Sequence, residues 1–197
     1  MYLAWTLGLG ATNRIIDVFI GNYNATGMLN SALFQIFITI LAGYNIYNGS
    51  NDYIDNSIIG YYIYDTIHLL SHNQYPYVVH HVCALYLIHL YITYQIAPFF
   101  YSNVMYFLME LSACMLNWMN LLGEYQIQNY RFKVLTYSVY TVTRVIAYPI
   151  FLINYIQIFY EPIWYHNVHV AINCMIYILS ICYITISVKK LSQKKLT

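Results

Sequence analysis

Two long stretches of this chain contain no charged side chain, and they restrict its possible folds more than any other feature. No Asp, Glu, Lys or Arg occurs from Thr66 to Met109 or from Pro162 to Val188. Only 8% of all residues are charged, whereas soluble domains carry about 25%. A helix needs about 20 mainly apolar residues to cross a bilayer. We therefore expect an all-α, polytopic integral membrane protein without a separate soluble domain.

Apolar segments separated by turn-forming residues define six predicted spans. The connectors contain Pro, Gly and an Asn-Gly pair, which favour turns. Strands of a membrane barrel would alternate polar and apolar residues, and these segments do not, so helices are predicted. The predicted spans are 29–47, 56–71, 77–95, 102–122, 132–158 and 166–188.

These spans divide the chain into three parts. Residues 1–28 are expected to form a cytosolic or interfacial segment, with a further span interrupted by Arg14 and Asp17 as the alternative. Residues 29–188 form the predicted transmembrane domain, and residues 189–197 form a basic cytosolic tail.

The distribution of basic residues predicts the orientation in the membrane. With six spans and a cytosolic C-terminus, all Lys and Arg residues except Arg144 lie on the cytosolic side, as the positive-inside bias requires. Lys194-Lys195 resembles the dilysine signal that returns membrane proteins to the endoplasmic reticulum, and it fits a basic anchor equally well. We expect the endoplasmic reticulum, or a host membrane if the A+T-rich source is viral.

The second and third predicted spans concentrate ionisable side chains at membrane depth, where such groups are costly and usually functional. Asp65, His68 and His72 are spaced so that they share one helical face. A short turn then returns the chain to His80 and His81. Both sets lie near the predicted cytosolic end, so we expect them at similar depth.

Asp65 is expected to approach His80 or His81. The other histidine should face a neighbouring helix, because adjacent helical residues point about 100° apart. A carboxylate that accepts an imidazole N–H fixes the tautomer and raises the basicity of the ring, which prepares a base or a nucleophile. These three residues are the candidate catalytic or acyl-binding site. The alternative is that Asp–His pairs only hold the hairpin together, and His68 is expected to be a packing or pocket residue.

Three further polar residues lie within predicted spans. Glu110 is deep in the fourth span, and Asn117 lies two turns later on the same face. Arg144 is in the fifth span, one turn before Pro149. We predict an interhelical ion pair between Glu110 and Arg144. Pro149 should kink its helix, which can open a cavity.

Four short sequence motifs occur in a characteristic order. They are Gly60-Tyr61 with Tyr64-Asp65, Val79-His80-His81 with Ala84-Leu85-Tyr86, Glu110-Leu111-Ser112 with Asn117, and Arg144 with Pro149. In this order they resemble the TLC-domain family of polytopic membrane proteins, which includes the ceramide synthases. The resemblance covers roughly residues 29–188 and implies a six-helix transmembrane bundle that encloses a lipid or acyl-chain pocket. It also implies that His80 and His81 correspond to the paired histidines of the ceramide synthase catalytic centre, where an acyl group passes from acyl-CoA to a sphingoid amine.

One block departs from the ceramide synthases. Those enzymes continue with a second acidic block that contains a His-Asp pair, whereas this chain reads Met109-Glu110-Leu111-Ser112. The chain therefore resembles more closely the branch whose members affect membrane phospholipid composition. We expect a protein that binds a lipid or acyl chain within its bundle and acts in membrane-lipid metabolism or homeostasis. The alternative is an acyl-CoA-dependent acyltransferase that uses the His80–His81 pair.

Other ligands and partners are restricted by composition and motif. A di-iron hydroxylase is disfavoured because the HxxHH box is absent, Tyr77 standing three positions before His80. No metal and no cofactor are expected, apart from acyl-CoA as a substrate. A net charge of +1 gives no reason to propose nucleic-acid binding. The expected partners are the lipid bilayer and a membrane lipid or fatty acyl chain, and a homodimer remains an open alternative.

Overall fold

The computed structural model describes residues 23–49, 54–71, 75–127 and 129–193 of the chain. In this part of the chain every regular element is a helix and no strand occurs, as an all-α fold requires. The predictions for residues 1–22 and for Lys194-Lys195 lie outside the described residues. The elements are α2 (Tyr23–Asn48), α3 (Ile54–Ser71), α4 (Tyr75–Tyr94), α5 (Phe99–Glu124), α6 (Tyr130–Tyr140), the π-helical segment η1 (Thr141–Ala147), α7 (Tyr148–Phe159) and α8 (Trp164–Gln193).

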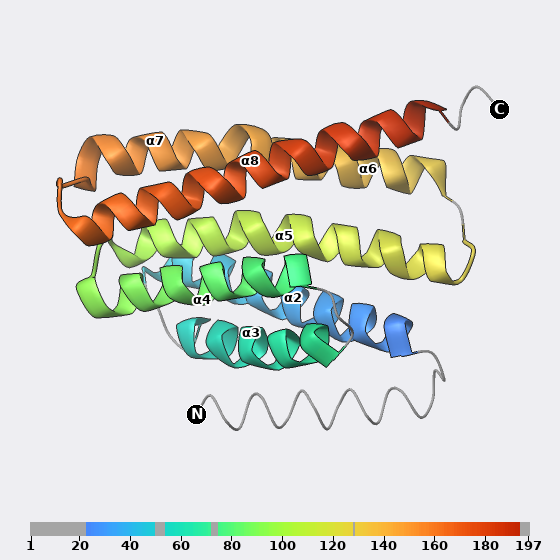
Figure 1. Ribbon diagram of the computed structural model, residues 1–197, viewed down its shortest axis with the longest axis horizontal. Coiled ribbons are helices and arrows are strands. Elements are labelled where there is room, and N and C mark those ends of the chain that lie inside the picture. The colour runs from blue at the N-terminus through green and yellow to red at the C-terminus, as the bar shows by residue number, and fades with distance from the viewer. Residues whose placement is uncertain (1–22, 50–53, 72–74, 128, 194–197) are drawn as a thin grey trace.

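Consecutive helices run back and forth along the long axis of the molecule (Figure 1). α6, η1 and α7 continue one another as a single pass, so the described part of the chain makes six passes. Five of these are long and apolar enough to cross a membrane, which confirms the polytopic prediction. They are Ala25–Asn48, Tyr77–Tyr94, Phe99–Glu124, Tyr130–Phe159 and Trp164–Lys189.

The predicted span 56–71 corresponds to α3, which is not among those five. Its Tyr, Asp and Asn side chains lower its mean hydropathy. With 18 residues it still extends about 27 Å and packs against α2 and α4 within the bundle. α3 is therefore a polar pass that packs on two neighbours, and Ile63, Ile67 and Leu70 are exposed on its other side.

Two helices extend beyond the predicted spans by five residues or more, and the others differ less. α2 starts at Tyr23, so residues 23–28 belong to this helix. α8 continues to Gln193 and includes the first residues of the predicted basic tail. A helix can continue through polar residues once its first turns have formed, whereas hydropathy marks only the apolar part.

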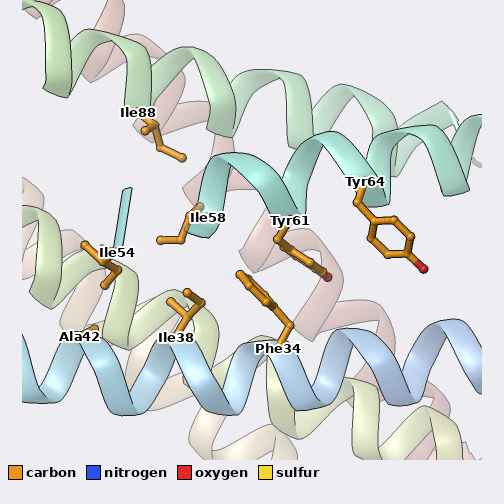
Figure 2. Close-up of a cluster of buried hydrophobic side chains, with 8 residues drawn as sticks. All are labelled: Phe34, Ile38, Ala42, Ile54, Ile58, Tyr61, Tyr64 and Ile88. Carbon is orange, nitrogen blue, oxygen red and sulfur yellow. The ribbon is translucent and has the colours of Figure 1, made fainter. Parts of the chain in front are cut away.

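An apolar core lies along the interface between α2 and α3 and includes Ile88 of α4 (Figure 2). The rings of Phe34 and Tyr61 stack in it with their centroids 4.1 Å apart. This contact fixes the rotation of α3 against α2, and it thereby directs Asp65, one turn after Tyr61, toward the bundle interior. The cluster contains Phe34, Ile38, Ala42, Ile54, Ile58, Tyr61, Tyr64 and Ile88.

Pro149 acts through a widened turn. The residues immediately before α7 form the π-helical segment η1, and Pro149 is the second residue of α7. Proline has no N–H, and its ring would clash with the carbonyl of Val145 in a regular α-helix. The wider π-turn relieves this clash, and the Val145 carbonyl accepts a hydrogen bond of 3.5 Å from Tyr177 on α8. The helix distortion predicted at Pro149 is thus a π-helical turn, and Arg144 lies within this turn.

Candidate functional site

A cavity of about 760 Å³ occupies the middle of the bundle, and every pass contributes residues to its wall. Along α4 it extends from Tyr77 to Tyr91, which corresponds to about 21 Å of helix. Pockets for small molecules usually measure about 300–1,000 Å³. The volume and the elongated shape therefore suit one long, flexible ligand.

Most of the exposed lining residues lie at one end of the cavity, which we call the mouth, and a further one, Leu179, lies midway along α8. Tyr77, Asn120 and Glu124 line the cavity and are solvent- or membrane-exposed. They lie at the end of the bundle where α3 is followed by α4 and α5 is followed by α6. This is the end for which the charge distribution predicts a cytosolic location.

Two tyrosines form the opposite end, which we call the floor. Tyr91 and Tyr106 line the cavity, and residues behind the wall hold both hydroxyls. The Tyr91 hydroxyl lies 3.1 Å from His169 Nε2 on α8. Tyr106 donates a hydrogen bond of 3.0 Å to Asp55 on α3. Because both rings are anchored from outside, the floor is a defined limit to the depth of the cavity.

Asp65 and His81 meet at the cavity wall. His81 Nδ1 lies 3.4 Å from Asp65 Oδ2, and Tyr61 donates a hydrogen bond of 3.4 Å to the same oxygen. Within the described residues, His81 Nδ1 has no hydrogen-bond partner. The two residues are therefore close together, but their contact lacks the geometry of the expected hydrogen bond. Both residues are buried.

His80 lines the same cavity. Its ring centroid lies 5.7 Å from that of His81. His81 is the histidine that approaches Asp65, and the cavity extends around this side of α4, so that both residues line it. Two imidazoles and one carboxylate are thus available to one ligand.

Glu110 and Arg144 also line the cavity, but they do not form the predicted ion pair. The acid that lies close to a basic side chain is Asp65, 3.4 Å from His81. Glu110 accepts a hydrogen bond of 2.9 Å from Tyr62 on α3. Arg144 bonds to neutral groups of α5, as described below. The two charges therefore remain separate features of the wall, because each has found a nearer partner on a neighbouring helix.

Asn117 and His68 complete the predicted set, and both line the cavity. Asn117 donates a hydrogen bond of 2.9 Å to Gln35 and so connects α5 to α2. His68 packs closely on Gly27, where a Cβ atom would lie 2.8 Å from His68 Nε2. Both residues lie in the half of the cavity nearer the mouth. All seven polar residues singled out by the sequence thus border one space, although their roles remain predictions.

Sequence reasoning missed the tyrosines of the wall. Tyrosines line the cavity and place hydroxyl groups among its apolar surfaces; they are Tyr61, Tyr62, Tyr77, Tyr91, Tyr106, Tyr140, Tyr148 and Tyr183. With 25 tyrosines in the chain, frequency alone does not separate these from the others. The available signal was position, because Tyr61 and Tyr62 lie within a turn of Asp65.

The arrangement offers acid–base and hydrogen-bonding chemistry. Imidazoles beside a carboxylate can move a proton or attack a carbonyl carbon, and a guanidinium can hold an anion. Within the described residues no three His, Cys, Asp or Glu side chains are grouped as metal ligands. His72 lies outside the described residues.

Comparison with known proteins gives one match. Residues 45–189 match the family model described as the TLC domain, which covers most of the chain and includes α3 to α7 and nearly all of α8. No curated protein matches the chain significantly, and no solved structure does so either.

Proposed function

Because this chain belongs to the TLC-domain family, we propose that it binds a lipid or acyl chain within its helical bundle and acts in membrane-lipid metabolism or homeostasis. The observation that supports this proposal is the elongated cavity of about 760 Å³ with a mouth at one end and a tyrosine floor at the other. Apolar side chains such as Leu87, Ile88 and Met105 lie between these ends. A linear hydrocarbon would bury its surface there, and a polar headgroup would meet the side chains of the wall.

Lipid analysis of the purified protein tests this proposal. Protein extracted in mild detergent should retain a lipid or fatty acyl compound in a defined ratio. Ala113→Trp, which fills the cavity, should reduce the retained amount several-fold. Ala171→Trp on the exposed face of α8 is the matched control and should retain the normal amount. The absence of any retained lipid, together with unchanged lipid composition in cells lacking the protein, would contradict the proposal.

A second candidate function is acyl-CoA-dependent acyl transfer, which the contact between His81 and Asp65 favours. An imidazole nitrogen of His80 or His81 would attack the thioester carbonyl, and the CoA thiolate would leave. The acyl group would then pass to an acceptor amine or hydroxyl, whose proton the imidazole takes up on release. The cavity mouth lies at the predicted cytosolic end, where acyl-CoA is present.

Intact-mass analysis after exposure to an acyl-CoA, combined with assay of CoA release, tests this mechanism. The double variant His80→Ala, His81→Ala should lose turnover. His89→Ala is the matched control, because His89 is an exposed histidine on α4 that does not line the cavity. Turnover that persists in the double variant would exclude the mechanism while leaving the lipid-binding proposal intact.

A further inference from the structure

Arg144 is a buried cation whose hydrogen bonds go to neutral groups. Its Nε donates to Ser112 Oγ at 2.7 Å, and its Nη2 donates to the Met109 carbonyl at 2.9 Å. The side chain is only 9% exposed, and its guanidinium lies 5.4 Å from the centre of the Tyr140 ring. In the described part of the chain no carboxylate oxygen lies within 4.0 Å of the guanidinium.

The third guanidinium nitrogen is free to bind a ligand. Nη1 makes no hydrogen bond to any described residue. It is also not among the solvent-inaccessible polar atoms that lack a hydrogen-bond partner. Arg144 lines the cavity, so a ligand held there can approach this N–H group. Nε and Nη2 are fixed by α5, so the orientation of Nη1 is set before a ligand arrives.

A cation at membrane depth is stabilised by an anion, and the wall does not supply one in direct contact. We propose that Arg144 anchors the carboxylate of a long-chain fatty acid held in the cavity. This inference rests on the proposed lipid-binding function and deepens it by naming the ligand class. Guanidinium and carboxylate groups match each other in planarity and hydrogen-bond geometry.

The charges around the cavity favour a single negative charge on the ligand. Two acids, Asp65 and Glu110, line the wall at depth and Glu124 lines the mouth, whereas Arg144 is the one guanidinium of the lining among the described residues. Arg144 is close enough to Glu110 to interact electrostatically. A phosphate with two negative charges would be opposed by both acids, and an amine would leave Arg144 without its anion. A carboxylate balances the guanidinium without adding a second charge.

The proposal is tested by the binding of three probes that have the same hydrocarbon chain and different headgroups: palmitate, 1-hexadecanol and hexadecyl phosphate. The full-length protein in detergent should bind palmitate at least about tenfold more tightly than either of the other probes, as a charge-assisted hydrogen bond provides. Arg144→Gln keeps a hydrogen-bonding side chain without the charge, and it should bind palmitate and hexadecanol equally. Glu110→Gln removes the neighbouring acid and should increase the preference for palmitate.

The outcomes separate the two proposals. Equal binding of palmitate and hexadecanol by the unaltered protein overturns the anchor and leaves the lipid-binding site in place. Tighter binding of hexadecyl phosphate overturns the carboxylate assignment. A palmitate preference that survives in Arg144→Gln also overturns the anchor. Binding of none of the probes overturns both proposals. If Arg144→Gln does not fold, the probe series on the unaltered protein and on Glu110→Gln still decides the question.

Discussion

Tyr62 on α3 donates a hydrogen bond of 2.9 Å to Glu110 on α5, and these residues are 48 positions apart in the sequence. Glu110 is 4% exposed, and this is its hydrogen bond within the described residues. The bond joins the polar pass α3 to the fourth span at the cavity wall. It also explains why Glu110 does not reach Arg144.

Tyr62→Phe should therefore destabilise the bundle. The substitution leaves a buried carboxyl group without its hydrogen-bond partner, which costs about 1–3 kcal/mol. Thermal unfolding in detergent measures the effect as a lowered midpoint. Tyr44→Phe is the control, because Tyr44 is 59% exposed on α2 and should show no change. Equal midpoints for the two variants would contradict the structural role of this bond.

Asp65→Asn tests the contact with His81 in acyl transfer. The amide keeps the size of the carboxylate but no longer stabilises an imidazolium, so turnover should fall by about 100-fold or more if the second candidate function holds. Lipid retention should not change, since the cavity keeps its shape. Glu161→Gln is the control, because Glu161 is an exposed carboxylate that does not line the cavity. Unchanged turnover in Asp65→Asn would rule out an orienting role for this carboxylate.

Alanine substitutions at two glycines of α2 test whether ligands enter the cavity at its mouth. Alanine at Gly27 would place a Cβ atom 2.8 Å from His68 Nε2, so His68 must move. Alanine at Gly43 would meet the Phe107 ring at 3.7 Å, which is an ordinary contact. Gly43→Ala should stabilise the helix by about 0.5–1 kcal/mol, and Gly27→Ala should gain less. Gly27→Ala should also slow palmitate uptake in a stopped-flow assay, and identical uptake rates in the two variants would argue against a mouth at His68.

Tyr91, one of the two floor tyrosines, should limit the acyl-chain length of the bound lipid. Tyr91→Leu removes the ring that His169 holds at the closed end of the cavity, so longer acyl chains should be accepted. Tyr91→Phe keeps the ring and should preserve the chain-length distribution, with a small loss of stability from the broken hydrogen bond. Mass spectrometry of co-purified lipids compares the two variants. A distribution that stays the same in Tyr91→Leu would show that the cavity does not end at this residue.

Much of the fold could be predicted because its determinants are local. The length of the apolar segments predicted the helical passes to within a few residues, including α3. The helical spacing of Asp65 and His68 placed both residues on one face of α3. The tertiary contacts were less predictable. The expected Glu110–Arg144 pair was replaced by bonds to Tyr62 and Ser112, because a polar group in a bundle binds the nearest partner that the rotation of neighbouring helices presents.

The sequence by itself determined that the chain is a polytopic helical membrane protein with ionisable groups at membrane depth. Long apolar segments must form helices in a bilayer, and ionisable residues within such segments are rare because their burial is costly. Only the tertiary structure decided that seven polar residues from separate helices border one cavity, that both His80 and His81 reach it, and that two tyrosines close it. These outcomes depend on how each helix is rotated against its neighbours. That rotation is set by packing contacts such as the stacking of Phe34 on Tyr61, which join residues far apart in the chain.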